Sequence, residues 1–248
     1  MDILTFFTPA EMSGVDYIPD AVIIFDVLRG STTISSAFKS GTSRIIPAAD
    51  IGKANDLAEK IGRGNVLLCG STNGEKIEGF DLSGSPLEAS GDRVAGKTII
   101  YLAVNISNAI SASKKAARVL IGCFNNMQAV LESIGHPRTI HLVCAGKMGR
   151  FSFEDAVCAG MFVQLVVDSF SGEIALNDAS STARFLYYRH HRDLEGMLRQ
   201  SSQGHHLSKL GYDDDLEYAA QISNINIVPE LSLDKTHLIS TTVLENVY

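Results

Sequence analysis

The sequence predicts an α/β protein: three layers built on a mostly parallel sheet, with a helix-rich C-terminal part. Two observations carry this prediction. Short apolar runs rich in Val and Ile recur along the chain, and they alternate with stretches whose apolar residues repeat every three or four positions. After residue 152 the short apolar runs give way to several helical patterns in succession.

Each predicted strand is a short apolar run bounded by polar or turn-forming residues. In chain order these runs cover residues 21–25, 44–47, 66–68, 98–104, 118–121 and 139–143. The stretches between and after them carry apolar residues at helical spacing. They predict helices over 50–62, 105–116, 125–134, 152–167 and 178–188, with further helical stretches to about residue 223.

Length and composition limit the class of protein. The 248 residues are 45% hydrophobic and 20% charged, which is ordinary for a folded globular chain that needs no disulfide or metal to hold it together. We expect one unit over residues 1–248. A boundary between two α/β lobes near 134–139 is the alternative, because His136 and Pro137 interrupt a helix there. The four cysteines lie far apart, which favours reduced thiols.

The charge balance excludes two classes of partner. Lys and Arg number 21 against 28 Asp and Glu, a formal charge of −7, and no basic run occurs. We therefore expect neither nucleic acid nor an anionic membrane as a partner. No apolar stretch reaches the roughly 18 residues that a membrane span needs, so a cytoplasmic location is the expectation. A homodimer is the assembly left open.

The first motif with chemical potential surrounds Asp26, which follows the apolar run 21–25. Active sites of α/β folds lie at the carboxyl ends of strands. A carboxylate placed there can bind Mg²⁺ or attack phosphorus, while Arg29 and the amides at the start of the next helix can hold phosphate oxygens. The alternative is structural: Asp26 caps a turn, and Ser31 beside it caps the helix.

A second motif covers residues 141–160, in which a strand runs into a glycine-containing loop and then into a helix. Ser152 and Asp155 are spaced as in a capping box, which explains both without a function, but it does not explain Glu154. Five residues separate Cys144 from Arg150. Cysteine phosphatases wrap a phosphate around a reactive thiolate at this spacing, so a thiolate mechanism is kept as an alternative.

Other polar regions carry weaker signals. The Gly- and Ser-rich stretch 70–96 is longer than a routine connection, which favours a functional or mobile loop containing Asp81 and Ser85. The adjacent histidines 205–206 diverge on a helix and cannot share a metal, so solvent exposure is the expectation. The acidic run 213–215 fits the N-terminus of a helix without any function.

The chain resembles a known family in four ordered segments: AVIIFDVLRGSTTI, EKIEGFDLSGSPLE, CAG-x-x-GR-x-S-x-ED-x-x-CAG and LSKLGYDDDLEYAAQ. Together they resemble the 2-phosphosulfolactate phosphatase family, over residues 2–228. The resemblance implies an α/β fold and a Mg²⁺-dependent phosphatase. Such an enzyme hydrolyses 2-phospho-3-sulfolactate to sulfolactate and phosphate, a step toward coenzyme M. The expected partner is therefore a small phosphorylated acid.

The resemblance also implies roles for individual residues. The residues expected to act in catalysis are Asp26, Arg29 and Arg150, with Cys144 as the alternative nucleophile that its spacing from Arg150 suggests. Those expected to bind the substrate are Ser31, Thr32, Asp81, Ser85, Asn105 and Asn126. Those expected to hold Mg²⁺ are Asp26, Glu154 and Asp155, because the match to the third segment favours more than a capping role for the last two.

The chain departs from the family pattern in two loops. Where the family usually reads G-E-R-G-G, residues 70–74 read G-S-T-N-G, so hydroxyls replace a carboxylate and a guanidinium. Where it usually reads T-T-N-G-T, residues 103–107 read A-V-N-I-S, and Gly84 replaces the asparagine before Ser85. Two alternatives follow: a phosphatase for another small phosphorylated acid, or a catalytically impaired homologue that binds an anion.

Overall fold

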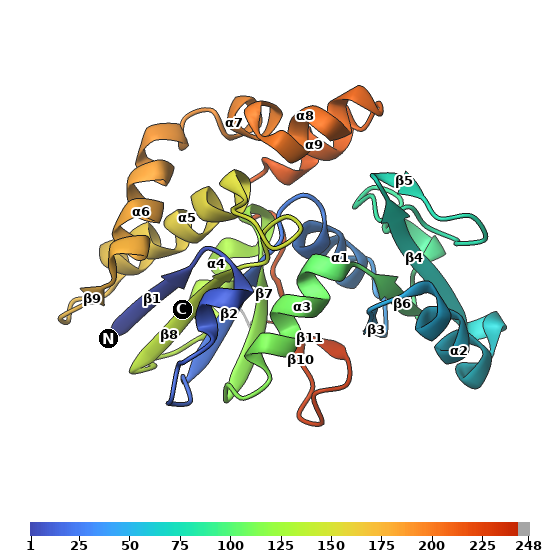
Figure 1. The fold of residues 1–248 in the computed structure, drawn as a ribbon, viewed down its shortest axis with the longest axis horizontal. Helices are drawn as coiled ribbons and strands as arrows, with labels where there is room; N and C mark the ends of the chain where they lie inside the picture. Colours follow the sequence, from blue (N-terminus) through green and yellow to red (C-terminus); the bar gives the residue numbers. More distant parts are fainter. Residues whose placement is uncertain (243–248) are drawn as a thin grey trace, which may run out of the picture.

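The computed structural model describes residues 1–242, and they form an α/β fold around a single sheet. Its strands are β1 (Asp2–Phe6), β2 (Ala21–Phe25), β3 (Arg44–Ala48), β4 (Val66–Thr72), β5 (Glu75–Lys76), β6 (Thr98–Leu102), β7 (Arg118–Gly122), β8 (Thr139–Cys144), β9 (Ala175–Leu176), β10 (Ile227–Leu231) and β11 (Leu238–Thr242). Their order is β5-β4-β6-β3-β11-β10-β7-β2-β8-β1-β9 (Figure 1). The neighbours within β4-β6-β3 and within β7-β2-β8-β1-β9 are parallel, which confirms the predicted mostly parallel sheet.

Helices follow most of the strands and cover both faces of the sheet. In residues 1–242 they are α1 (Gly30–Lys39), α2 (Ile51–Ile61), α3 (Val104–Ser113), α4 (Met127–Ser133), α5 (Phe153–Ser169), α6 (Asp178–His190), α7 (Leu194–Gln200), α8 (Ser202–Lys209) and α9 (Asp213–Ala219). Figure 1 shows α7, α8 and α9, in orange, above one end of the sheet and apart from both helical layers. These three helices cap the carboxyl ends of the strands.

The core divides into layers on opposite faces of the sheet. The side chains of Ile23 and Phe25 in β2 belong to a core that α4, α5 and α6 cover. The side chains of Val22 and Ile24 belong to a second core on the other face, which α1 and α3 cover. Because neighbouring residues of a strand point to opposite faces, β2 is apolar throughout, and its sequence signal is correspondingly clear.

A hairpin from the C-terminal part lies in the centre of the sheet, between the two parallel groups. β10 pairs antiparallel with β7 through Glu230 and Leu120, and β11 pairs antiparallel with β3 through Leu238 and Ile45. Arg118 donates to both carboxylate oxygens of Glu230 at 2.8 Å. The negative charge of Glu230 in β10 is thus paired with a positive charge from β7. The sequence pattern does not predict this hairpin, and it does not predict β1 either.

The predicted elements otherwise agree with the structure to within a few residues. The expected strand 98–104 ends at Leu102, because Val104 already begins α3. Strands on the two sides of residues 134–139, the alternative lobe boundary, belong to one sheet, with β8 between β2 and β1. Within residues 1–242, no helix is both long and apolar enough to cross a membrane.

Candidate active site

A pocket of about 720 Å³ opens at the carboxyl ends of β2, β4, β6 and β8. One side, which we name the charged wall, consists of Asp26, Leu28, Arg29, Gly30, Gly146, Lys147, Met148, Gly149, Ser152 and Glu154. The opposite side, the neutral wall, consists of Ser71, Thr72, Asn73, Gly74, Gly84, Tyr101, Leu102, Ala103, Val104, Asn105 and Asn108. Gln203 and His206 of α8 complete the lining. The strand-end location agrees with where α/β folds place active sites.

Asp26 follows β2 and lines the pocket with only 7% of its surface exposed. Burial raises its pKa to about 7, and the nearby charge of Glu154 adds to this effect. A hydrogen bond from the backbone of Gly30 acts in the opposite direction. Position 30 requires glycine, because a Cβ there would lie 2.4 Å from Oδ2 of Asp26. The first residue of α1 is thereby brought directly against the carboxylate.

Glu154 and Asp155 begin α5 but face different surroundings. Glu154 lines the pocket at 4% exposure, and burial raises its pKa. Asp155 does not line the pocket. Its Oδ1 accepts a hydrogen bond from the amide of Val27 at 2.9 Å, and its Oδ2 accepts one from the amide of Gly146 at 3.1 Å. Asp155 therefore fixes the loops after β2 and β8, and its role as a metal ligand stays a prediction.

Asp26 and Glu154 fit a hard divalent cation. In the part of the chain that the structure describes, neither carboxylate forms an ion pair with Lys or Arg, although both are almost fully buried. Two neighbouring buried carboxylates favour a cation between them. No three His, Cys, Asp or Glu side chains among residues 1–242 form a metal cage of their own. Mg²⁺ suits such a site, because it is commonly bound by one or two carboxylates together with waters and phosphate oxygens.

The surroundings of this acidic pair attract an anion. The N-termini of three helices face the pocket, at Gly30 of α1, Val104 of α3 and Ser152 before α5. Each helix N-terminus carries a partial positive charge and N–H groups without partners in the helix. Lys147 adds a full positive charge, in a loop closed by two backbone hydrogen bonds between Lys147 and Arg150 at 2.9 and 3.0 Å. The acidic pair suits Mg²⁺ and the positive groups around it suit a phosphate, so the pocket has both features that hydrolysis of a phosphomonoester with Mg²⁺ requires.

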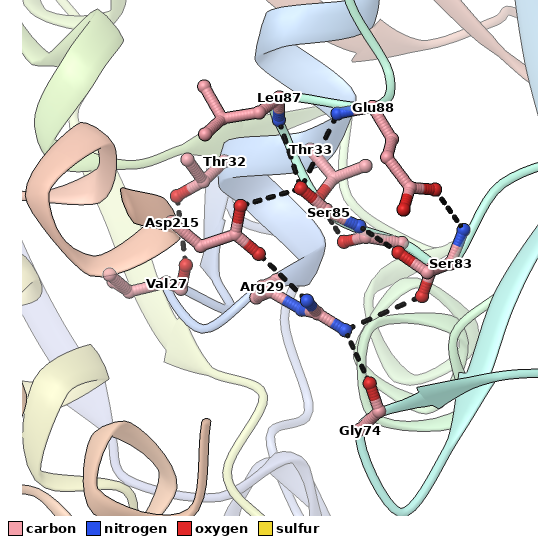
Figure 2. A network of polar contacts seen from close by, with 11 residues as sticks. Val27, Arg29, Thr32, Thr33, Gly74, Ser83, Ser85, Leu87, Glu88 and Asp215 are labelled. Carbon is pink, nitrogen blue, oxygen red and sulfur yellow. Dashed lines mark hydrogen bonds and ion pairs between the residues drawn. The ribbon is translucent and has the colours of Figure 1, made fainter. Parts of the chain in front are cut away.

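Arg29 lines the pocket, but other residues already hold its guanidinium (Figure 2). Nη1 donates to Oδ2 of Asp215 at 2.7 Å, and Nη2 donates to the carbonyls of Gly74 at 3.0 Å and Ser83 at 3.4 Å. The guanidinium carbon lies 4.3 Å from the centre of the Tyr212 ring. A helix N-terminus alone does not account for Asp215, which is buried and paired with Arg29.

Two hydroxyls expected to bind the substrate hold the backbone instead. Ser31 Oγ accepts a hydrogen bond from the amide of Asp26 at 2.8 Å. Thr32 Oγ1 donates to the carbonyl of Val27 at 2.8 Å. Both side chains are fully buried and neither lines the pocket. Both residues therefore fix the loop between β2 and α1, and their contact with the substrate stays a prediction.

Three further residues expected to bind the substrate also form hydrogen bonds within the protein. Oδ2 of Asp81 accepts a hydrogen bond from a backbone amide of β4 at 2.7 Å, and Oδ1 of Asn126 accepts one from the amide after β7 at 2.9 Å. Ser85 Oγ donates to Oδ1 of Asp215 at 2.5 Å. None of the three lines the pocket. Asn105 does line it, so its predicted substrate contact keeps a geometric basis.

Cys144 and Arg150 are not brought together around an anion site. Cys144 ends β8 with no exposed surface, and burial raises the pKa of its thiol well above the ordinary value. Arg150 is exposed, and neither residue lines the pocket. A reactive thiolate needs an accessible and electropositive environment, so this geometry disfavours the cysteine mechanism.

Comparison with known proteins relates this pocket to a family. A family model described as 2-phosphosulpholactate phosphatase matches residues 6–234. The chain belongs to this family. A protein named probable 2-phosphosulfolactate phosphatase from Caldicellulosiruptor saccharolyticus is 34% identical over 237 residues, covering 93% of this chain and 96% of that protein. One of the same name from Caldanaerobacter subterraneus subsp. tengcongensis is 32% identical over 232 residues, covering 93% and 95%.

Membership of the 2-phosphosulfolactate phosphatase family confirms the resemblance and makes the chain a phosphatase, a phosphoric monoester hydrolase. The two loops in which the chain departs from the usual family pattern form much of the neutral wall. Ser71 and Thr72 offer hydroxyls there, and Val104 is 55% exposed. Oδ1 of Asn105 accepts a hydrogen bond from the amide of Met148 at 3.2 Å, which connects the neutral wall to the charged wall.

Several pocket residues lie outside the set that the sequence predicts: Lys147, His206 and Tyr101. Lys147 occupies a variable position of the third family segment, and only its charge in a glycine-rich loop gives a signal. His206 is half-buried, and its Nε2 lies 2.8 Å from the carbonyl of Asn73, whereas His205 is exposed as expected. Tyr101 is a buried strand residue whose hydroxyl position depends on the fold.

Proposed function

We propose that the chain hydrolyses 2-phospho-3-sulfolactate to sulfolactate and inorganic phosphate with Mg²⁺ as its cofactor. The observation that carries this proposal is the buried pair of carboxylates, Asp26 and Glu154, in a pocket that three helix N-termini face. A divalent cation and a phosphate dianion together match this combination of charges. The names of the relatives support the choice of substrate.

The charged residues of the pocket receive distinct roles in this proposal. Asp26 and Glu154 hold the cation, and Mg²⁺, when bound, neutralises charge that develops on the phosphoryl oxygens. The partial positive charges at the N-termini of α1 and α5 attract the phosphate. Lys147 pairs with an acidic group on the body of the substrate, because Lys147 has no ion-pair partner within residues 1–242.

Hydrolysis forms a bond between a water oxygen and phosphorus and breaks the ester bond on the opposite side of phosphorus. The attacking water loses a proton in this step, and we assign its acceptance to the carboxylate of Asp26. This carboxylate lines the pocket and lies against Gly30, the first residue of α1. The leaving alkoxide takes a proton from solvent.

A second candidate is hydrolysis of another small phosphorylated acid. The neutral wall favours it, because Ser71 and Thr72 carry no charge where the usual family pattern has a carboxylate and a guanidinium. A hydroxyl cannot replace the bidentate contact that arginine makes to an acidic group. For the first candidate, we propose a cytoplasmic reaction on the route to coenzyme M, and a homodimer is the assembly to examine.

A phosphate-release assay tests the proposal. The purified chain is incubated with phosphosulfolactate and with a series of small phosphorylated acids, each in MgCl₂ and in EDTA. We expect release from phosphosulfolactate that EDTA abolishes and added MgCl₂ restores. Faster release from a different acid favours the second candidate, and release that persists in EDTA contradicts the Mg²⁺ requirement. Binding of inorganic phosphate without any turnover identifies an anion-binding homologue.

A further inference from the structure

A buried ion pair connects the active-site loop to the helices that cap the pocket. The side chains of Arg29 and Asp215 are 5% and 3% exposed, and Nη1 lies 2.7 Å from Oδ2. Arg29 directly precedes α1, whereas Asp215 lies in the first turn of α9. Figure 2 shows Asp215 between Arg29 and Ser85, so that three distant parts of the chain meet at one carboxylate.

The hydrogen bonds of Arg29 leave few donors for a ligand. A guanidinium has five N–H donors, and three of them are used by Asp215, Gly74 and Ser83. Two donors remain, and Arg29 lines the pocket. The direction of these two donors is fixed because the other three are held on opposite sides, by α9 and by the loops at residues 74 and 83.

Asp215 is itself held at both oxygens. Oδ2 accepts from Arg29, and Oδ1 accepts from Ser85 Oγ at 2.5 Å. The hydroxyl oxygen of Ser85 in turn accepts hydrogen bonds from the amides of Leu87 and Glu88 at 3.2 and 3.4 Å. A carboxylate with both oxygens engaged in a buried network cannot rotate freely, which is typical of a group that orients another side chain.

Arg29 shares its pocket with the acidic pair, Asp26 and Glu154, and this makes its orientation important. A guanidinium and a carboxylate form strong bidentate pairs when nothing else holds them. The Asp215 carboxylate supplies Arg29 with a partner outside the pocket. Asp26 and Glu154 therefore stay available for other ligands.

We propose that Asp215 is a positioning residue of the phosphatase site, which holds Arg29 so that its remaining donors face the phosphate and not the acidic pair. This inference rests on the proposed function for its phosphate ligand. It also assigns a reason for the contact between the capping helices and the strand-end loops: α9 supplies the charge that orients Arg29.

The experiment compares Asp215→Asn with Asp214→Asn. Asp214 is the neighbouring residue of α9, it is exposed, and it carries the same charge without contacting Arg29. Calorimetry with inorganic phosphate and MgCl₂ gives the Kd, and the phosphate-release assay gives kcat and KM. We expect Asp215→Asn to weaken phosphate binding at least about fivefold and to lower kcat/KM by about 10²-fold, since small misplacement of a catalytic group has effects of this size. Asp214→Asn should stay within about twofold of the parent.

A double-mutant cycle with Arg29→Gln distinguishes orientation of Arg29 from general support of the fold. If Asp215 acts through Arg29, Asp215→Asn changes phosphate binding by less than about twofold once Arg29 is already glutamine. Equal losses in both backgrounds overturn the inference, and so does an Asp215→Asn variant with unchanged Kd per folded protein. A parent that turns over no phosphoester refutes the proposed function alone, whereas a parent that binds no phosphate overturns this inference.

Discussion

The two walls of the pocket differ in chemistry although both are built from strand ends. The charged wall, after β2 and β8, carries two buried carboxylates, a lysine and an arginine. The neutral wall, after β4 and β6, carries hydroxyls, amides and aliphatic side chains without one charge. Both walls receive a helix N-terminus, so the electrostatic attraction for an anion is shared between them.

From this difference we expect the charged wall to carry the reaction and the neutral wall to recognise the substrate. Charges that stabilise a phosphoryl group must be fixed in position and buried, which the charged wall achieves through Gly30 and Asp155. We expect the neutral wall to contact the part of the substrate that lies away from the phosphate. Substrate specificity is therefore expected to change through residues 71–74 and 103–105, while the reaction itself depends on the charged wall.

The largest expected effect comes from removing one charge of the charged wall. Asp26→Asn should lower kcat by at least about 10²–10³-fold, the usual loss for a preorganised electrostatic contact. Thermal unfolding at pH 8 should occur at the parent temperature or above it, because the substitution removes a buried charge whose pKa is raised to about 7.

The matched control for this substitution is Asp81→Asn. Asp81 also lies in a predicted motif, but it holds a backbone amide of β4 and an arginine, Arg63, outside the pocket. Its activity should stay within about twofold of the parent. Equal losses of activity in the two variants would contradict the distinction between Asp26 and a structural aspartate.

A smaller effect is expected from adding charge to the neutral wall. Ser71→Glu combined with Thr72→Arg restores the charges of the usual family pattern, and kcat/KM for phosphosulfolactate should rise by about tenfold or more, since a charge-assisted contact contributes about 1.5–3 kcal/mol. Ser71→Gln with Thr72→Gln supplies similar size without charge and serves as control. If the charged pair performs no better than the glutamine pair, the neutral wall does not limit this substrate.

The pH dependence of stability tests whether the carboxylates of the charged wall are buried and hard to ionise. The folded-state pKa of Asp26, about 7, lies above its ordinary value of 3.8, so the folded protein binds more protons than the unfolded chain between these values. The free energy of unfolding without Mg²⁺ should therefore fall as pH rises from about 4 to 7, by about 1.4 kcal/mol for each unit of pKa shift at most.

Melting curves in EDTA and in MgCl₂ at pH 5 and pH 8 measure this dependence. Added Mg²⁺ should raise the melting temperature more at pH 8, because a cation competes with protons for the same carboxylates. A melting temperature that is independent of both pH and Mg²⁺ would argue against buried carboxylates that ionise in the folded state.

The smallest effect on activity is expected at Cys144. Cys144→Ser should retain activity within about twofold, and activity should survive thiol alkylation, because the thiol is buried outside the pocket. A serine hydroxyl without a hydrogen-bond partner at this position should lower the free energy of unfolding by about 1–3 kcal/mol. Loss of activity without loss of stability would instead support the thiolate mechanism.

The sequence predicts the parallel strands well and the central hairpin not at all. β2 is apolar on both faces, and β7 and β8 each contain a short run of Val, Leu and Ile, which gives a clear local signal. β10 carries Pro229 and Glu230, and β7, its neighbour on the side away from β11, is distant in sequence. The charge of Glu230 is tolerated only because Arg118 pairs with it, and a local pattern contains no trace of that partner.

In the candidate site, too, the sequence predicts features that depend on neighbouring residues and misses those that depend on residues far away in the chain. Asp26, Glu154 and Asn105 line the pocket, because strand ends and helix starts place them there. Ser31 and Thr32 have polar side chains of the expected type, but backbone groups within a few residues use them first. Asp215 escapes prediction for the opposite reason. A helix N-terminus explains an aspartate locally, whereas its partner Arg29 lies far away in the sequence.

The hairpin of β10 and β11 has a consequence for the order in which the chain is made. Among the strands of residues 1–242 it comes last in the sequence, yet within the sheet the groups β4-β6-β3 and β7-β2-β8-β1-β9 are joined only through it. During synthesis, β3 and β7 leave the ribosome before residues 227–242, so one edge of each strand lacks its hydrogen-bonding partner until then. Unpaired edges recruit other chains, and late long-range pairing is slow. We therefore expect the nascent chain to be most prone to aggregation just before the hairpin is synthesised.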